Sequence, residues 1–355
     1  MHTDPTPRRI RAWWCALAVV VTLGVVAFLL YSTGTYDSWR DGRSLDRACD
    51  GTLAQDGLAA AIGSSRLKAE PDDGSSLAQC FVKTSPTGTG RAVQVTLRWS
   101  TTGAPSGASV WYDTVGNGVD AQAAPLGQGW SGVVRRDGTW QVMVSLDCVN
   151  QKSKALVAYG DLYGTSDGTA LTGLGRVTTE TARKAADKYG CRVDAGKPLA
   201  KVPTAQLGKP DTAKPLSEAR GSCAALRGTR AAQSGTPQIM EYPLDADAPQ
   251  TNCYLVTKDH KPGYGLYAYY GAAAKDFQSA GPDSGGNERV WATADCPRSA
   301  QEAIFVLYRL YDRDTDSFPA ARYSTEVATS VLKAFADREA QLRGCSDVRV
   351  ISGKA

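Results

Sequence analysis

The longest apolar stretch of the chain lies close to its start. Residues 12–31 read AWWCALAVVVTLGVVAFLLY and contain no charged side chain. Because an α-helix rises about 1.5 Å per residue, a run of this length just crosses a hydrocarbon core of about 30 Å. The pattern predicts a transmembrane helix. The alternative is a cleaved signal peptide, but its apolar region is usually about 7–15 residues long and ends at a small-residue cleavage site, whereas STGTYDSW follows here.

Charged residues flank this run unevenly. Arginines precede it and aspartates follow it: Arg8, Arg9 and Arg11 on one side, and Asp37, Asp41 and Asp46 on the other. The cytoplasmic flank of a membrane helix carries the excess of Lys and Arg, so we expect residues 1–11 to be a cytoplasmic tail. Residues 12–31 then form a single-pass signal anchor in the cell membrane, with the lipid bilayer as partner, and everything after them is extracytoplasmic.

The cysteines after the anchor repeat in order and in context. Asp147-Cys148 corresponds to Asp295-Cys296, and Gly190-Cys191 corresponds to Gly344-Cys345. This agreement indicates an internal duplication, and an oxidising exterior favours disulfides. Zinc is the weaker alternative, because the chain has no CxxC motif and only two histidines. The same pairing inside each copy predicts four bonds: Cys49 with Cys80, Cys148 with Cys191, Cys223 with Cys253, and Cys296 with Cys345.

Within each copy, the apolar pattern predicts both strands and helices. Val93, Val95 and Leu97 alternate with polar residues, which is the period of a half-buried strand. Asp137-Gly138 predicts a tight hairpin turn between GVVRR and TWQVMVSLDC. Three segments have helical features, at residues 53–62, at 178–189 with Thr179 as the expected cap, and at 324–343.

These elements divide the exported part into two modules. Residues 32–44 are polar and predict a short stalk, and residues 196–216 contain four prolines and predict an extended linker. The modules span residues 45–195 and 217–355. The predicted fold class is α+β, with an N-terminal transmembrane helix and two tandem disulfide-bonded modules. Each module is an antiparallel sheet with helices at its start and end, packed on one sheet face.

The start of the first module carries a family resemblance. Cys49-Asp50-Gly51-Thr52-Leu53, followed by Cys80, resembles small secreted or membrane-anchored actinobacterial cell-envelope modules of unknown function. These modules begin with a Cys-Asp-Gly-x-Leu helix and have a second cysteine in the next strand. The resemblance covers only the first part of copy one, and copy two departs from it with Cys223-Ala224-Ala225-Leu226. It implies an extracytoplasmic compartment and no particular activity.

Little catalytic chemistry is available after the anchor. The exported part has 37 basic and 35 acidic residues, and they form no basic cluster for nucleic acid. His260 is its single histidine and lies in the polar turn KDHKPGYG, where a solvated histidine is more common than a catalytic base. No glycine-rich phosphate loop or nucleophile elbow occurs, so no cofactor is expected. An enzyme would have to depend on paired carboxylates, as glycosidases do.

One acidic segment has a pattern that suits a cation. Asp312, Asp314 and Asp316 alternate as the oxygen ligands of calcium loops do. Ser317 stands where the turn glycine is expected and Tyr323 where a closing glutamate is expected. We therefore favour an ordinary acidic loop and keep the three aspartates as a weak metal candidate.

Tyrosines distinguish the second copy from the first. With the copies aligned on Cys80 and Cys253, Tyr267 and Tyr269 replace Gln94 and Thr96, on the face opposite the core. Exposed there, and with Tyr264 close by, they suit the binding of a glycan or a protein. The alternative is that the linker or the other copy covers them.

The sequence thus predicts a non-enzymatic, membrane-anchored binding or scaffolding protein of the cell envelope, with an envelope protein or wall glycan as partner. A cell-envelope hydrolase is the first alternative. The second is the sensing subunit of a membrane complex. A pocket with convergent carboxylates favours the hydrolase, and an open tyrosine-bearing sheet favours binding.

Overall fold

The structure is a computed structural model that describes residues 13–14, 17–25, 28, 35–71, 76–85, 90–102, 114–115, 122–137, 139–151, 154–203, 213–279, 289–297, 299 and 301–351. Residues 17–25 are helical. Within these ranges, no helix combines the length and the apolar character that crossing a bilayer requires. The predicted anchor extends beyond what is described, because residues 12, 15–16, 26–27 and 29–31 lie outside these ranges.

The fold is α+β, with two antiparallel sheets and four disulfides. The first sheet has the strand order β1-β2-β3-β8-β7-β6-β5. Its strands are β1 (Leu67–Pro71), β2 (Ala78–Thr84), β3 (Ala92–Trp99), β5 (Gln122–Pro125), β6 (Gly132–Asp137), β7 (Thr139–Asp147) and β8 (Ala155–Tyr163). β3 covers the segment whose alternation predicted a strand. β6 and β7 pair from Asp137 and Thr139 onward, which confirms the predicted hairpin, although Gly138 lies outside the described residues.

The second sheet has the order β16-β13-β14-β12-β11-β10-β9. Its strands are β9 (Lys214–Pro215), β10 (Gln238–Glu241), β11 (Gln250–Val256), β12 (Pro262–Tyr269), β13 (Arg289–Asp295), β14 (Ala303–Arg309) and β16 (Ser346–Ile351). A short parallel pair, β4 (Thr114–Val115) with β15 (Tyr311–Asp312), links the two halves of the chain.

The internal repeat is visible in the strand order. The run β1-β2-β3-β8-β7 of the first sheet corresponds to β10-β11-β12-β14-β13 of the second. The copies differ beyond this run: β6 lies beside β7, whereas β16, which follows the last helix, lies beside β13. The extra strands β4, β5 and β6 explain why the second and third cysteines are farther apart in copy one.

One long helix packs against each sheet. α6 (Thr325–Arg343) begins where predicted, and the Ser324 side chain accepts a hydrogen bond from the Val327 N–H. α4 (Gly168–Lys188) begins earlier than the predicted Thr178, and its cap is Asp167, which accepts from the Ala170 N–H at 2.8 Å. α4 lies close to β8 because Gly160 has no side chain: a Cβ there would be 2.0 Å from Thr178 Oγ1.

The region before the first sheet corrects three sequence interpretations. Residues 35–44 of the predicted stalk belong to α2 (Thr35–Gly51), and residues 32–34 of it lie outside the described ranges. The Cys49-Asp50-Gly51 motif does not start a helix: all three residues have positive φ and form a left-handed turn at the end of α2. The predicted helix at 53–62 is reduced to α3 (Leu58–Ile62), which Gly63 closes in the left-handed conformation.

The four disulfides join the pairs that the repeat predicts: Cys49–Cys80, Cys148–Cys191, Cys223–Cys253 and Cys296–Cys345. The first part of the predicted linker packs on the first module. Leu199 and Val202 are buried, and the Trp130 indole N–H donates to the Lys197 carbonyl. A Cβ on Gly196 would lie 2.5 Å from the Trp130 ring, so only glycine fits there. The start of the linker is therefore part of the first module.

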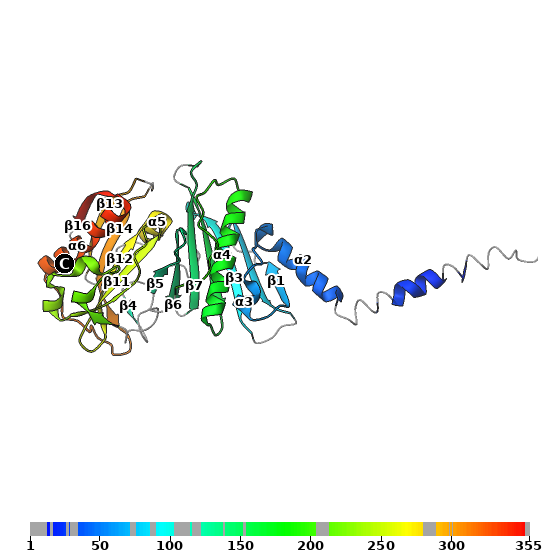
Figure 1. Cartoon of the computed structure of the whole chain (residues 1–355), viewed down its shortest axis with the longest axis horizontal. Coiled ribbons are helices and arrows are strands. Elements are labelled where there is room, and N and C mark those ends of the chain that lie inside the picture. Colours follow the sequence, from blue (N-terminus) through cyan, green and yellow to red (C-terminus); the bar gives the residue numbers. More distant parts are fainter. Residues whose placement is uncertain are drawn as a thin grey trace, which may run out of the picture.

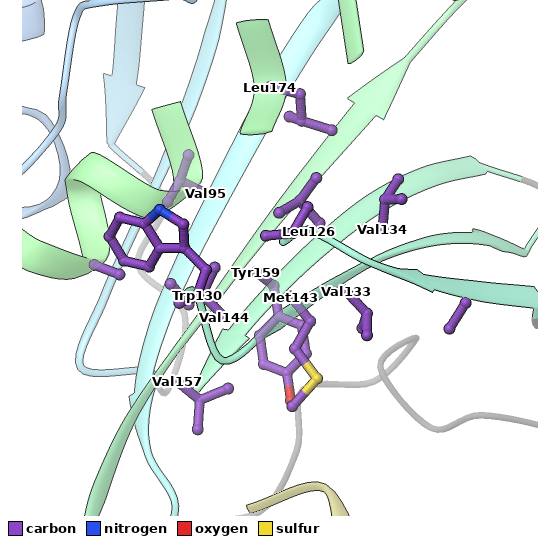
Figure 2. Close-up of a cluster of buried hydrophobic side chains, with 14 of the residues drawn as sticks. Val95, Leu126, Trp130, Val133, Val134, Met143, Val144, Val157, Tyr159 and Leu174 are labelled. Atoms are coloured by element: carbon purple, nitrogen blue, oxygen red, sulfur yellow. The ribbon is translucent and has the colours of Figure 1, made fainter. Parts of the chain in front are cut away.

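The two sheets pack against each other on the faces that α4 and α6 leave uncovered. One continuous cluster of buried side chains combines the first module's core with the outer face of the second sheet, whereas a separate cluster fills the space between that sheet and α6. Figure 1 shows the second sheet on the left, the first in the centre, and α2 directed away from both. Figure 2 shows part of the shared cluster, from Leu174 of α4 to Tyr159 of β8.

Candidate functional site

Two of the three tyrosines proposed as a binding surface, Tyr267 and Tyr269, are buried in the cluster that the two modules share. Tyr267 and Tyr269 do point away from the module's own core, as the alternation predicts, but their exposed fractions are 1% and 0%. Tyr264 lies on the opposite face, where its ring stacks on Tyr323 at 3.8 Å and its hydroxyl donates to the Ala321 carbonyl. The prediction of an open tyrosine surface is therefore wrong: Tyr267 and Tyr269 are buried in the shared cluster, where the Tyr269 ring also stacks on Phe277 at 5.0 Å.

A buried polar network fixes the interface between the modules. Arg98 of β3 forms an ion pair with Asp276 of α5 (Gly271–Ser279), and Tyr159 of β8 donates to the same carboxylate at 3.2 Å. Burial raises the pKa of the Asp276 carboxyl against the opposing effect of Arg98. Burial, with the nearby Asp276 charge, raises the pKa of Tyr159 to about 12. The modules are thus joined by a specific contact as well as by apolar packing.

Beside this network lies a cleft of about 800 Å³ between the modules. Corresponding loops of the two copies line it, one around Cys148 and the other just after Cys296. The first residues of α5 form a third wall. Its polar lining consists of Ser100, Ser131, Ser145, Asp147, Lys154, Asp194, Lys275, Ser299 and Gln301.

Short-range hydrogen bonds hold the cleft walls in place. The Ala155 N–H donates to the Ser100 hydroxyl at 3.0 Å, which ties the end of β3 to the start of β8. The Gln301 N–H donates to the Ser299 hydroxyl at 3.0 Å, which shapes the opposite loop. The Lys154 ammonium lies 3.8 Å from the centre of the Trp99 ring, a cation–π contact that orients this side chain.

Among the acidic side chains of the cleft, Asp147 has a pKa that its surroundings raise. It ends β7 and faces the first residue of α5, since a Cβ on Gly271 would lie 3.9 Å from one carboxylate oxygen and 4.0 Å from the other. Asp147 is exposed to solvent at the cleft surface, but the nearby walls still partly desolvate its carboxyl and raise its pKa above the ordinary 3.8. The cleft therefore offers hydroxyls and both signs of charge, with one acid that holds its proton to a higher pH than usual.

The acidic segment at 312–316 does not assemble a metal site in the described part of the chain. Asp312 accepts from the Lys261 ammonium at 3.2 Å and from the Thr315 hydroxyl at 2.8 Å. Asp316 accepts instead from the Tyr311 hydroxyl. With these partners, the aspartates form a hydrogen-bonded acidic loop. His260 is exposed in the turn between β11 and β12, as expected of a solvated histidine.

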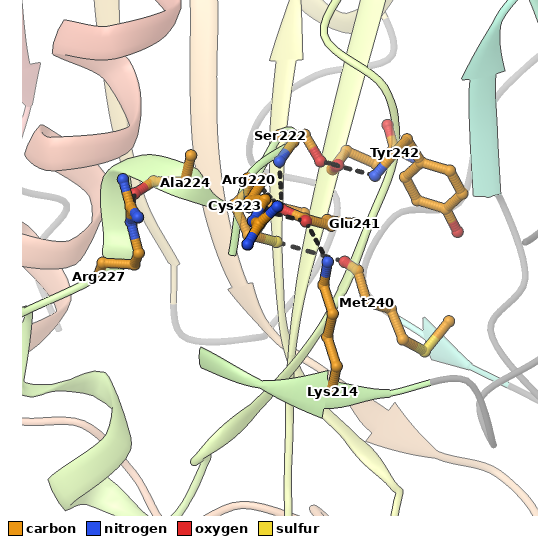
Figure 3. Close-up of polar contacts among 12 residues, drawn as sticks. Lys214, Arg220, Ser222, Cys223, Ala224, Arg227, Met240, Glu241 and Tyr242 are labelled. Atoms are coloured by element: carbon orange, nitrogen blue, oxygen red, sulfur yellow. Dashed lines mark hydrogen bonds and ion pairs between the residues drawn. A yellow bond between two sulfur atoms is a disulfide. The ribbon is translucent and has the colours of Figure 1, made fainter. Parts of the chain in front are cut away.

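A carboxylate that the sequence did not single out organises the start of the second module. Glu241 of β10 accepts from the Gly221 N–H at 2.7 Å and forms an ion pair with Lys214 at 2.7 Å. It also accepts from the N–H groups of Arg220 and Cys223, as Figure 3 shows. This arrangement fixes the loop that carries the Cys223–Cys253 disulfide, and it is structural because these contacts occupy both carboxylate oxygens.

Comparison with known proteins adds no functional assignment. No protein-family model, curated protein sequence or solved structure matches the chain. The resemblance noted at Cys49–Leu53 therefore gains no support beyond the residues themselves.

Proposed function

We propose that the protein is a membrane-anchored, extracytoplasmic binding protein of the cell envelope, and that it binds its ligand in the cleft between the two modules. The observation that carries this proposal is the polar cleft of about 800 Å³, lined by both copies. Ligand sites of small molecules are typically concave, about 300–1,000 Å³ in volume, and often lie between domains.

Three features support the extracytoplasmic anchoring. Residues 12–31 carry no charge, and three arginines lie within four residues before them, whereas the first arginine after them is Arg40. The described apolar side chains of this segment lack protein cover: Trp13, Leu17 and Leu23 are 77%, 56% and 64% exposed. An apolar helix without packing partners is favoured where lipid surrounds it. Four disulfides suit an oxidising compartment.

The lining indicates the chemical class of the ligand. Serine hydroxyls, the Gln301 amide, two lysines and two aspartates can hydrogen-bond sugar hydroxyls and pair with both carboxylates and ammonium groups. Fragments of a wall glycan that carry short peptides combine all three groups. We therefore propose a wall glycopeptide as the ligand.

Binding is tested by calorimetric titration of the full chain, in detergent micelles, with wall fragments solubilised by a muramidase. Lys154→Gln and Asp194→Asn remove charges from the cleft, and each should weaken binding at least about fivefold, since a charged hydrogen bond contributes about 1.5–3 kcal/mol. Lys258→Gln, an exposed lysine outside the cleft, is the matched control and should leave binding unchanged. Equal affinity of all variants, or no binding by the wild-type chain, contradicts the proposal.

A second candidate is a wall-polymer hydrolase, because Asp147 and Asp194 line the same cleft and the pKa of Asp147 is raised. In such an enzyme Asp147 would donate a proton to the leaving oxygen, and Asp194 would act as base or nucleophile. Mass spectrometry of wall fragments after incubation decides between the candidates. Cleavage that Asp147→Asn abolishes favours the hydrolase, and intact fragments favour a binding protein.

A further inference from the structure

α2 presents a stripe of aromatic and basic side chains to solvent. Tyr36, Arg40, Arg43 and Arg47 follow one another at spacings of four, three and four residues. Trp39 lies three residues after Tyr36 and four before Arg43, so all five share one helix face. We call this set the juxtamembrane stripe. All five are exposed, with Tyr36 at 49% and Trp39 at 54%. The Arg43 guanidinium lies 4.2 Å from the centre of the Trp39 ring, and the two aromatic rings are 6.1 Å apart.

The opposite face of α2 packs on the first module. Asp41, Leu45 and Ala48 are buried there, and the Ala69 N–H of β1 donates to the Ser44 hydroxyl at 2.9 Å. α2 is therefore held in one orientation, and the stripe faces away from the protein. Within the stripe, the Arg40 guanidinium lies 3.5 Å from the Asp37 carboxylate of the same helix.

The position of α2 in the chain brings this stripe to the membrane. The apolar run ends at Tyr31 and α2 begins at Thr35. An extended chain covers at most about 3.6 Å per residue, so α2 begins within about 14 Å of the end of the run. Tyrosine and tryptophan concentrate at the lipid headgroup level, and arginines pair with lipid phosphates.

We propose that the juxtamembrane stripe binds the headgroups of anionic phospholipids in the outer leaflet and so holds the first module against the bilayer. This inference rests on the membrane anchoring proposed above, to which it adds a second, electrostatic contact. The contact fixes the distance and tilt of the modules, and with them the direction in which the cleft faces.

Photocrosslinking of the full chain in lipid vesicles tests this contact. Trp39 is replaced by benzoylphenylalanine, and the chain is reconstituted into vesicles with or without phosphatidylglycerol. Lipid adducts at position 39 should be abundant in the anionic vesicles. They should fall at least about fivefold in neutral vesicles or with Arg40→Gln, Arg43→Gln and Arg47→Gln combined, since each basic residue near an anionic surface contributes about fivefold in affinity. Salt at about 1 M should have a similar effect, because it screens surface charge.

Two controls separate this contact from other outcomes. The triple variant Arg227→Gln, Lys258→Gln and Arg338→Gln removes the same charge from exposed positions of the second module and should leave the adducts unchanged. Benzoylphenylalanine at Phe318, also exposed in the second module, should give no lipid adduct. Chain that floats with the vesicles without a lipid adduct at position 39, or with adducts insensitive to the arginines, overturns the stripe proposal alone. Chain that does not float with the vesicles overturns the anchor as well.

Discussion

The Arg98 guanidinium of the first sheet and the Asp276 carboxylate of α5 form an ion pair across the interface between the two modules. Arg98 is 2% exposed and also donates to the Tyr159 hydroxyl at 2.8 Å. Removal of one partner of a buried pair leaves an uncompensated charge, which typically costs about 3–5 kcal/mol. The same pair holds α5, whose first residues line the cleft.

Asp276→Ala should therefore lower the free energy of unfolding by about 3–5 kcal/mol in urea denaturation of the full chain. Glu326→Ala breaks the Arg230–Glu326 pair, whose side chains are 49% and 76% exposed, and is the matched control. Exposed pairs contribute about 0–1 kcal/mol, so this variant should be nearly as stable as the wild type. Similar small losses in both variants would show that Arg98 is not buried by the second module.

Tyr267→Ser and Tyr269→Ser combined should reduce stability by at least about 5 kcal/mol, because truncation of a buried aromatic side chain costs about 3–5 kcal/mol. Their rings stack on each other at 6.2 Å, and Tyr269 also stacks on Phe277 of α5 at 5.0 Å. Tyr163→Ser, at a tyrosine that is 39% exposed, should change stability by little more than the 0.5 kcal/mol or so typical of the surface. Thermal denaturation followed by near-UV circular dichroism measures the stability of the wild type, the double variant and Tyr163→Ser. An unchanged melting temperature in the double variant would contradict the burial of the two rings.

The contributions of Asp161 and Asp167 to the stability of the fold should depend on pH in opposite directions. Burial raises the pKa of Asp161 above 3.8, so its stabilising contribution is full below that value and is lost as pH rises through the folded-state pKa. Hydrogen bonds from the Ala170 N–H and from Arg91 lower the pKa of Asp167, so its contribution is present above 3.8 and is lost as pH falls through the folded-state pKa.

Calorimetric melting from about pH 3 to about pH 7 separates these two effects. Asp161→Asn should gain stability relative to the wild type as the pH rises, because it removes a charge that burial disfavours. Asp167→Asn should lose relative stability over the same range, because it keeps the helix cap but not the charge. A common sign for both variants would contradict the assigned causes.

Each disulfide closes a loop within one module, with sequence separations of 31, 43, 30 and 49 residues. In the chain-entropy model, loops of this length contribute about 3–4 kcal/mol each. Cys223→Ala with Cys253→Ala should lower stability by about this amount and leave the other three bonds intact. Peptide mapping under non-reducing conditions checks the pairing, and a bond between the modules would refute the shared scheme.

The local parts of the fold could be predicted because short-range patterns determine them. Ser324 caps α6 and the alternation at Val93 gives β3, since both depend on neighbours in the sequence. The start of α4 was missed because Gly168, Gly173 and Gly175 interrupt its apolar pattern, although Asp167 three residues before Ala170 was a usable cap signal.

The site could not be predicted because it depends on how the modules meet. Strand alternation correctly gave the face on which Tyr267 lies, but alternation does not reveal which surface covers that face. The cleft draws residues from separate segments such as Ser100, Asp194 and Gln301, and no sequence spacing brings these together. Arg98 and Asp276 are 178 residues apart in the sequence, so spacing does not predict their buried ion pair either.

The most direct test of the central claim, that both modules together form the binding site, is hydrogen exchange of the full chain with and without muramidase-solubilised wall fragments. Mass spectrometry should show slower exchange in peptides covering residues 145–155 and 271–275 together, because one ligand in the cleft contacts both modules. The exchange rate of peptides from α6 should not change when the fragments are added. Protection confined to one module, or its absence from both segments at a saturating fragment concentration, would contradict the account.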